Sequence, residues 1–346
     1  MLKSEKNSKN ISKKVSEKTL LIFLAIFFNS CAVFIGGKST APLVENASNR
    51  KYLPTLLEIL KNAQKEVLFS QLYFHIDDTT GKIISVLDEL TSRGVDVRAI
   101  LEDSVQWNDR SSNILNALGV YAKLDSTATF NHAKFFVVDG KVVLVGSTNL
   151  SCMSIDRNNE VDVLIKDERI AEWFREYFFS LWNQMPAPSG VRSGFVEVIP
   201  PGKLKDAFVR LFDSAKDKIK IIIYGIRIYP DEKENPVTIT LDHLKKAKER
   251  GVDVEIVFEI SDYNESLNKQ TQEVKKYLEE MSFKNLYFDD PKTITHAKLL
   301  IVDDAVVLGS SNWGYGGFSL YREANVLIED KKLASEFCDY FERIKQ

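Results

Sequence analysis

Two segments of the chain carry the same set of side chains that can act on a phosphate group. The first segment contains His132, Lys134, Asp139 and the run Gly146-Ser147-Thr148-Asn149. The second segment contains His296, Lys298, Asp303 and the run Gly309-Ser310-Ser311-Asn312. A double displacement at phosphorus needs one group that attacks and one that protonates the leaving alcohol. One histidine from each segment would supply these groups.

The spacing of these residues predicts a phosphate cradle. Alternate residues of a strand share a face, so His132 and Lys134 should point to the same side, as should His296 and Lys298. We expect the lysines to supply positive charge and Ser147, Asn149, Ser310 and Asn312 to bind phosphate oxygens. Asp139 and Asp303 have the opposite parity and are expected to support the loop or strand.

Histidine titrates near neutral pH, so one copy can attack phosphorus while the other donates a proton. The attack would form a covalent phosphohistidine, and water or another alcohol would then take the phosphoryl group. The attacking imidazole must keep a lone pair available, which favours a carboxylate on its other nitrogen. Glu160 and Glu323, which follow the two motifs, are the candidates for this role.

The elements around the motifs also occur twice, which indicates an internal duplication. Apolar residues at helical spacing predict helices over 53–64 and 203–216, each followed by an apolar strand over 67–74 or 219–228. Later in each copy, Gly94 or Gly251 suits the end of a helix, and a Val-Asp-Val strand follows. A tight turn at Asp139-Gly140 should join antiparallel strands over 134–138 and 142–146.

The duplication predicts the organisation of the chain. We expect two halves, residues 51–183 and 202–346, joined by a linker over 184–201 that holds four of the nine prolines. Strands that alternate with helices predict an α/β fold in which each half is a mixed sheet flanked by helices. The halves should pack with pseudo-two-fold symmetry.

Residues 1–50 are predicted to be a targeting or anchoring segment with a spacer. Residues 1–19 are polar and basic, and an apolar run over 20–28 matches the length of a signal-peptide core. Cys31 closes a run that loosely resembles a lipoprotein cleavage box. A cleaved signal peptide, a lipid anchor and a short uncleaved anchor all fit, and each predicts an exported, membrane-associated protein with its catalytic part outside the cytoplasm.

Composition restricts the other kinds of function. The net charge is −3 and the basic residues concentrate in the N-terminal segment, so the remaining chain is acidic and gains no general electrostatic attraction to nucleic acid. The three cysteines form no metal-binding pattern, and Cys152 and Cys338 are expected to be free thiols. His75 with Asp77 and Asp78 resembles a metal ligand set, but the repeat has Arg227 at this position and no carboxylate pair, so no metal is predicted.

The two motifs resemble those of the phospholipase D superfamily, whose signature is HxKx4D followed by GSxN. The resemblance covers about residues 52–345. It implies a single active site between two related halves and phosphodiester hydrolysis or transfer without a metal or other cofactor. It further implies that His132 is the nucleophile, that His296 is the acid, and that Glu160 and Glu323 orient these histidines.

Three functions follow from this interpretation. The first is an enzyme of phospholipase D type that acts on phospholipid at a membrane surface and needs no obligate protein partner. The second is an exported or membrane-tethered nuclease with the same catalytic residues, for which nucleic acid is the substrate. The third, a non-catalytic binding module, is disfavoured because both histidines are intact. Trp313, with Tyr315 and Phe318 nearby, could line the substrate pocket or belong to the core.

Overall fold

The computed structural model describes residues 41–125 and 128–346. The predicted targeting run over 20–35, with Cys31, lies outside these residues. Among the described residues, no helix has both the length and the apolar character needed to span a bilayer.

The first half contains a seven-stranded mixed sheet with the strand order β1-β7-β6-β5-β2-β3-β4. Its strands are β1 (Leu43–Asn46), β2 (Glu66–Gln71), β3 (Asp96–Leu101), β4 (Tyr121–Leu124), β5 (Phe135–Val138), β6 (Val142–Gly146) and β7 (Asp162–Lys166). Its helices are α2 (Tyr52–Lys61), α3 (Asp78–Ser92), α4 (Gln106–Ala117) and α5 (Glu168–Trp182), with a 3-10 turn η1 (Asn49–Lys51) and a π-helical turn η2 (Met153–Arg157).

The second half repeats this arrangement in an eight-stranded sheet with the order β12-β11-β10-β13-β14-β15-β9-β8. Its strands are β8 (Arg192–Ser193), β9 (Val196–Ile199), β10 (Lys218–Ile223), β11 (Asp253–Phe258), β12 (Asn285–Phe288), β13 (Lys298–Val302), β14 (Ala305–Gly309) and β15 (Asn325–Glu329). Its helices are α6 (Leu204–Ser214), α7 (Pro236–Glu249), α8 (Glu265–Glu280) and α9 (Lys331–Ile344), with a π-helical turn η3 (Gly316–Leu320).

Each sheet is parallel on one side and antiparallel on the other. Strands β2, β3 and β4 are parallel, whereas β5, β6, β7 and β1 continue the sheet with antiparallel pairs. The same pattern holds for β10, β11 and β12 and for the strands beyond them. The predicted α/β fold with two mixed sheets flanked by helices is therefore confirmed.

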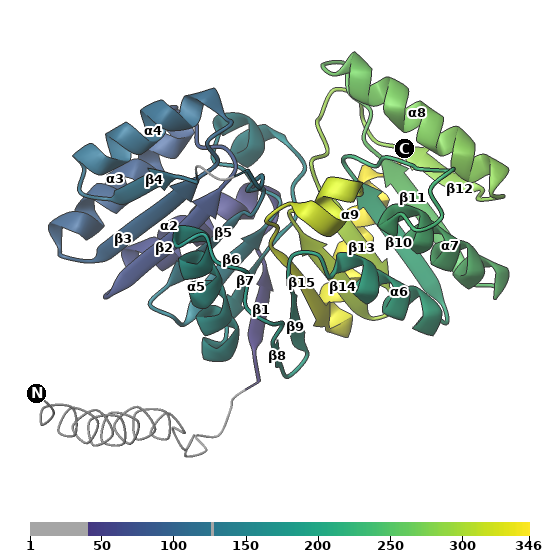
Figure 1. The fold of residues 1–346 in the computed structure, drawn as a ribbon, viewed down its shortest axis with the longest axis horizontal. Helices are drawn as coiled ribbons and strands as arrows, with labels where there is room; N and C mark the ends of the chain where they lie inside the picture. The colour runs from purple at the N-terminus through teal and green to yellow at the C-terminus, as the bar shows by residue number, and fades with distance from the viewer. Residues whose placement is uncertain (1–40, 126–127) are drawn as a thin grey trace, which may run out of the picture. The chain divides into compact units, whose positions relative to one another are not determined.

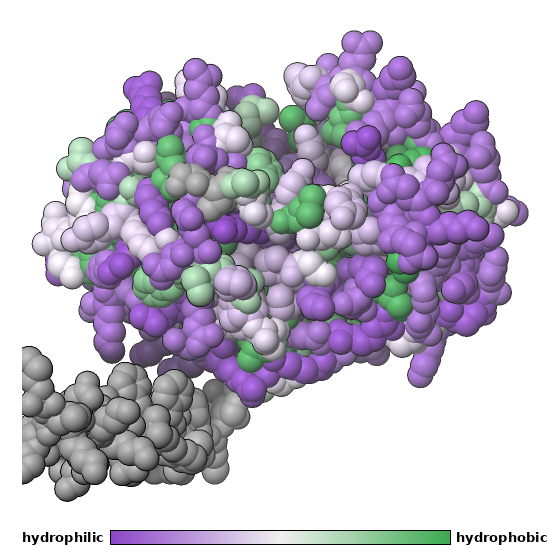
Figure 2. Space-filling view, viewed as in Figure 1, coloured by the Kyte–Doolittle hydropathy of each residue, from purple (hydrophilic) through white to green (hydrophobic). Residues whose placement is uncertain are grey.

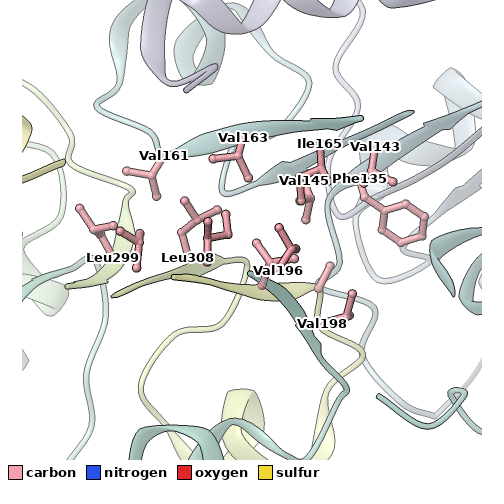
Figure 3. Close-up of a cluster of buried hydrophobic side chains, with 14 of the residues drawn as sticks. Phe135, Val143, Val145, Val161, Val163, Ile165, Val196, Val198, Leu299 and Leu308 are labelled. Atoms are coloured by element: carbon pink, nitrogen blue, oxygen red, sulfur yellow. The ribbon is translucent and has the colours of Figure 1, made fainter. Parts of the chain in front are cut away.

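The two sheets pack against each other through a shared apolar core. In Figure 3, Val161, which directly precedes β7, and Val163 of β7 face Leu299 and Leu308 of the second sheet, and Val145 of β6 faces Val196. The apolar faces of α5 and α9 join this core, which includes Phe174 and Phe337 at 0 % exposure. Helices α2 to α4 and α6 to α8 cover separate cores on the outer faces of the sheets (Figure 1).

Two predicted boundaries were wrong. Residues 41–50 are not a spacer outside the fold, because β1 pairs with β7 from Leu43 to Asn46 and η1 follows it. Residues 184–201 are not only a linker, because β9 pairs with β15 and extends the second sheet. Both short strands depend on a partner far along the chain, which local sequence patterns do not reveal.

The strands that lead to the site are shorter than predicted. The strand expected over 67–74 ends at Gln71, and the one expected over 219–228 ends at Ile223. Beyond these ends, Phe74 and Ile226 each form one isolated bridge, to Leu150 and Trp313. The chain therefore leaves each sheet and returns beside the residue that follows the GSxN run.

Hydrophilic side chains predominate on the face of the molecule shown in Figure 2. Hydrophobic residues occur there in small separate groups, in agreement with their concentration in the three cores.

Candidate active site

The two histidine motifs meet where the halves join. His132 lies three residues before the start of β5, and His296 lies two residues before the start of β13. The backbone N–H of His132 donates to the carbonyl of Arg322 at 2.8 Å, and the N–H of Asn159 donates to the carbonyl of Ile294 at 2.9 Å. These contacts link each motif to the segment that follows the other motif.

Each histidine is held by the glutamate of the opposite half. Nδ1 of His132 lies 3.0 and 3.1 Å from the carboxylate oxygens of Glu323. Nδ1 of His296 lies 2.9 Å from Glu160. Because an ionised carboxylate only accepts hydrogen bonds, we assign the proton of each neutral imidazole to Nδ1 and the lone pair to Nε2. The carboxylates therefore fix the tautomer that a nucleophile requires.

The serines of the GSxN runs hold these glutamates, so their predicted role in phosphate binding was wrong. Ser147 Oγ donates to Glu160 at 2.6 Å, and Ser310 Oγ donates to Glu323. Each hydroxyl also accepts a backbone N–H at 2.9 Å, from Val161 or Ala324. A hydroxyl has a single proton to donate, and here a glutamate receives it.

The two motif lysines are buried, and the charge of Lys134 acts on the pKa of Lys298. Lys134 Nζ donates to the carbonyl of His132 at 2.7 Å, and Lys298 Nζ donates to that of His296 at 2.5 Å. Burial lowers the pKa of Lys134 to about 8, so this lysine remains charged at neutral pH. Burial also lowers the pKa of Lys298 well below its usual value, and the positive charge of Lys134 lowers it further.

Burial keeps both histidines neutral. It lowers the pKa of His132 to about 4, although Glu323 acts in the opposite direction. The pKa of His296 is also lowered, mainly by burial, and the charge of Lys134 from the other half contributes. Lys298 acts on His132 in the same way. Each imidazole thus responds to the lysine of the opposite motif, in agreement with the crossed hydrogen bonds that bring both motifs into one site.

Asn149 and Asn312 are placed to bind a ligand. Both side chains are half-buried. The side-chain oxygen of each is shielded from solvent and has no hydrogen-bond partner among the described residues. A shielded acceptor without a partner is costly, which makes these oxygens candidates for contact with a donor group of a ligand.

Of the two alternatives left open for Trp313, the structure supports a place in the core rather than in a substrate pocket. Its side chain is 3 % exposed and packs against Phe208 and Phe318, with ring centroids 5.0 and 6.1 Å away. The first half has Leu150 at this position, also fully buried. An apolar residue after the asparagine therefore anchors the GSxN run to the core.

The motif aspartates support the sheet, as their parity predicted. The carboxylate of Asp139 accepts the backbone N–H groups of Gln64, Lys65 and Glu66 at 2.7–3.0 Å. Asp303 accepts those of Lys216, Asp217 and Lys218 at 2.9–3.0 Å. Each aspartate thus fixes the start of the strand that precedes the site.

Sequence reasoning missed a second pair of glutamates beneath the histidine loops. The carboxylate of Glu102 accepts the backbone N–H of Asn131, and that of Glu259 accepts the N–H of Thr295, both at 2.6 Å. These N–H groups belong to the residues directly before His132 and His296. The signal was present, because both glutamates follow directly after duplicated Val-Asp-Val strands.

Aromatic residues complete the walls around the histidines. Phe130 stacks on His132 with centroids 5.9 Å apart, and the ring of Tyr224 meets that of His296 at 4.6 Å. Tyr177 and Tyr340 donate across the interface to the backbone carbonyls of Glu323 and Glu160, at 3.0 and 3.4 Å.

His75 contacts the residue that caps α3. Its Nδ1 lies 3.3 Å from Asp77, and Asp77 caps α3 by accepting the N–H groups of Thr79 and Thr80. In the part of the chain that the structure describes, no group of three or more potential ligands could hold a metal ion.

Comparisons with known proteins agree with this geometry. A family model described as cardiolipin synthase, phospholipase D-like domain, matches residues 56–182 and 208–345. The mitochondrial cardiolipin hydrolase of Chlamydomonas reinhardtii is 33 % identical over 107 residues, which are 30 % of this chain and 48 % of that protein. A probable cardiolipin synthase of Bacillus subtilis is 26 % identical over 163 residues, 45 % of this chain and 31 % of that protein.

The chain thus spans less than half the length of these curated relatives. Among solved structures, the phosphatidylserine synthase of Haemophilus influenzae has the same fold, with a TM-score of 0.68 at 14 % identity over 86 % of this chain and 85 % of that chain. The matched regions contain both histidine motifs and cover most of the chain, so the chain belongs to the phospholipase D superfamily.

Proposed function

We propose that the chain is a phosphodiesterase of phospholipase D type that acts on phospholipids through a phosphohistidine intermediate. The observation that carries this proposal is the crossed arrangement of the histidines, in which Glu323 holds His132 and Glu160 holds His296. Both imidazoles thereby have a fixed tautomer within one site.

In the first step, Nε2 of His132 attacks phosphorus and forms a P–N bond. The bond from phosphorus to the leaving alcohol breaks, and His296 donates a proton to the departing oxygen. In the second step, water or another alcohol attacks phosphorus and gives its proton to His296. The P–N bond then breaks and restores His132.

His296 must be protonated for the first step, although its pKa is lowered in the empty site. A phosphodiester carries a negative charge, and an opposite charge beside an imidazole raises its pKa. Substrate binding therefore favours the acid form. Lys134, Lys298 and the side-chain amides of Asn149 and Asn312 would stabilise the charge that develops on the phosphoryl oxygens.

A phospholipid substrate is supported by the relatives, whose names include cardiolipin hydrolase, cardiolipin synthase and phosphatidylserine synthase. We further propose that residues 1–50 contain a signal or anchor that exports the protein and holds its active site beside a membrane. The apolar run over 20–28 motivates this part of the proposal.

The test compares two substrates in the presence of a metal chelator. The full chain is incubated with radiolabelled phospholipid vesicles and with a single-stranded DNA oligonucleotide. We expect the lipid to be consumed. We also expect radiolabel bound to the protein to be released by acid and to survive base, because the P–N bond of phosphohistidine is labile in acid and stable in base. Cleavage of DNA alone would reject the lipid substrate in favour of a nuclease. Cleavage of neither substrate would reject the enzymatic proposal.

A further inference from the structure

The two halves place different side chains at one equivalent position beside the active site. The backbone N–H of His75 donates to the carbonyl of Leu150, and that of Arg227 donates to the carbonyl of Trp313, both at 2.8 Å. Leu150 and Trp313 directly follow Asn149 and Asn312. His75 and Arg227 therefore occupy matching places next to the asparagines.

The side chains at 73 and 75, and those at 225 and 227, are expected to point toward the asparagines. Phe74 and Ile226 form the isolated bridges and are buried in the outer cores. Their neighbours in an extended segment project to the opposite side. In the second half this direction is observed directly, because a Cβ atom placed on Gly225 would lie 3.5 Å from Asn312 Oδ1.

Aromatic rings occupy this place in the first half. Tyr73 corresponds to Gly225, and its ring lies parallel to that of His75 with centroids 6.0 Å apart. Trp107 packs edge-on against His75 at 5.4 Å. The Nδ1 atom of His75 also has Asp77 as a partner at 3.3 Å. Among the described residues, two aromatic rings and an imidazole paired with Asp77 therefore occupy this side of the site.

The second half has an open position and an available cation. Gly225 leaves no side chain beside Asn312. Arg227 is exposed, and its guanidinium lies 5.5 Å from the centroid of the Tyr229 ring. Tyr229 is positioned in turn, because its hydroxyl accepts the N–H of Tyr315 at 3.2 Å. Within residues 41–125 and 128–346, no carboxylate lies within ion-pair distance of Arg227.

We propose that Arg227 binds a second phosphate group of the substrate, beside the phosphate that reacts. This inference rests on the proposed function and narrows its substrate class to phospholipids in which a short alcohol joins two phosphates. The reacting phosphate receives its charge compensation from the buried Lys134 and Lys298. Arg227 lies two residues beyond Gly225, about 7 Å along an extended chain, and so is placed for a group farther from phosphorus.

Arginine suits this task better than its counterpart His75. Its guanidinium stays charged and presents a planar fork of donors that matches phosphate oxygens. Stacking on Tyr229 reduces the freedom that binding would otherwise remove. The active site therefore has a cationic group on the side of the second half and aromatic groups on the side of the first half. A substrate with one extra phosphate then has a single favoured orientation.

The test measures kcat/KM of the full chain on cardiolipin, which has two phosphates, and on phosphatidylglycerol, which has one. Both are presented in mixed micelles of equal surface charge, and loss of substrate is followed by mass spectrometry. For Arg227→Gln we expect a decrease of about tenfold to a hundredfold on cardiolipin and of less than about threefold on phosphatidylglycerol. Arg227→Lys should retain part of the preference, because it keeps the charge and loses the fork.

His75→Gln is the matched control at the equivalent position, and it should change both rates by the same small factor. If Arg227→Gln lowers both rates equally, or neither, Arg227 does not read a second phosphate and the inference is wrong. If the wild-type chain consumes neither lipid, the proposed function itself is wrong. The wild-type rates therefore distinguish the two failures.

Discussion

The two halves agree at the reacting centre and differ around it. In both, a glutamate from the opposite half holds the histidine, and a serine holds that glutamate. Outside this centre, Tyr73 and His75 of the first half correspond to Gly225 and Arg227 of the second half. Duplication thus preserved the groups that the chemistry needs twice and allowed the groups that meet the rest of the substrate to diverge.

A second difference lies beneath the histidine loops. In the first half, Asp125 forms an ion pair with Arg322 at 3.4 Å. In the second half, Asn159 takes the place of Arg322 and bonds to Thr295. There burial, and then the carboxyl of Asp289, raises the pKa of Glu259 to about 9. A similar scaffold therefore holds the ion pair of Arg322 and Asp125 in one half and a protonated carboxyl in the other.

The largest expected effect separates the two histidines. His132→Asn should lower the rate more than about 10⁴-fold with every substrate, because no nucleophile remains. His296→Asn should cost about 10²–10⁴-fold with an alkyl alcohol leaving group and much less with a nitrophenol, which leaves without a proton. His243→Asn, outside the site on α7, is the control. If the nitrophenyl substrate rescues His132→Asn instead, the assigned roles are reversed.

The crossed glutamates sharpen this comparison. Glu323→Gln should reduce activity about 10²–10⁴-fold, since an amide does not enforce the tautomer of His132. Glu160→Gln should cause a similar loss with an alkyl leaving group, but the nitrophenyl substrate should rescue it as it rescues His296→Asn. Steady-state rates on both substrates measure this pattern. Rescue of Glu323→Gln alone would contradict the pairing of each glutamate with the histidine of the opposite half.

A smaller effect follows from the burial of neutral imidazoles. The pKa of His132 falls from 6.5 to about 4 on folding, so the unfolded chain binds one more proton between these values. Stability is then complete above about pH 6.5 and is lost as pH falls toward 4, by on the order of 1–3 kcal/mol. The lowered pKa of His296 acts in the same direction.

Urea unfolding at pH 7.5 and 5 measures this loss. His132→Gln and His296→Gln should each flatten the dependence in part, and the double variant should flatten it further. If only one single variant has an effect, the two histidines are not equally excluded from solvent. If the double variant loses as much stability between pH 7.5 and pH 5 as the wild type, groups other than these histidines cause the pH dependence of stability.

The sequence predicted the parts of this comparison that repeat in register. The two motifs with His132 and His296, through their resemblance to the phospholipase D superfamily, predicted one shared site. The need of an attacking imidazole for a carboxylate on its other nitrogen pointed to Glu160 and Glu323 as the residues that orient the histidines. The α/β fold followed from periodicity and from the turn at Asp139. Each of these features depends only on residues close together in the sequence, and several of them occur once in each half.

Features that depend on packing between distant segments were not predictable. Nothing in the sequence states that Glu323 reaches His132, because parity along a strand does not describe how two sheets meet. Ser147 was assigned to phosphate because its backbone position fits, but its hydroxyl is committed to Glu160. Trp313 suited both an open pocket and a core, and only its neighbours decide between them.

The smallest effect tests the difference beneath the loops. Glu102 accepts the N–H of Asn131 and both the N–H and the hydroxyl of Ser104, so Glu102→Gln should destabilise the fold by about 2 kcal/mol. Glu259→Gln should cost less than about 1 kcal/mol at pH 5, since an amide resembles a protonated carboxyl and can donate to Asp289. Urea midpoints measure both, with the exposed Glu89→Gln as control.

The pH dependence of Glu259→Gln makes the comparison sharper still. Folded Glu259 keeps a proton up to about pH 9, whereas the unfolded chain releases it near 4.5. The wild type must therefore lose stability as pH rises between these values, and the glutamine variant lacks this loss. Relative to wild type, Glu259→Gln should become more stable from pH 5 to pH 8, while Glu102→Gln should show no such gain. Parallel pH curves for wild type and Glu259→Gln would mean that Glu259 is ionised and that the two carboxyl clusters are alike.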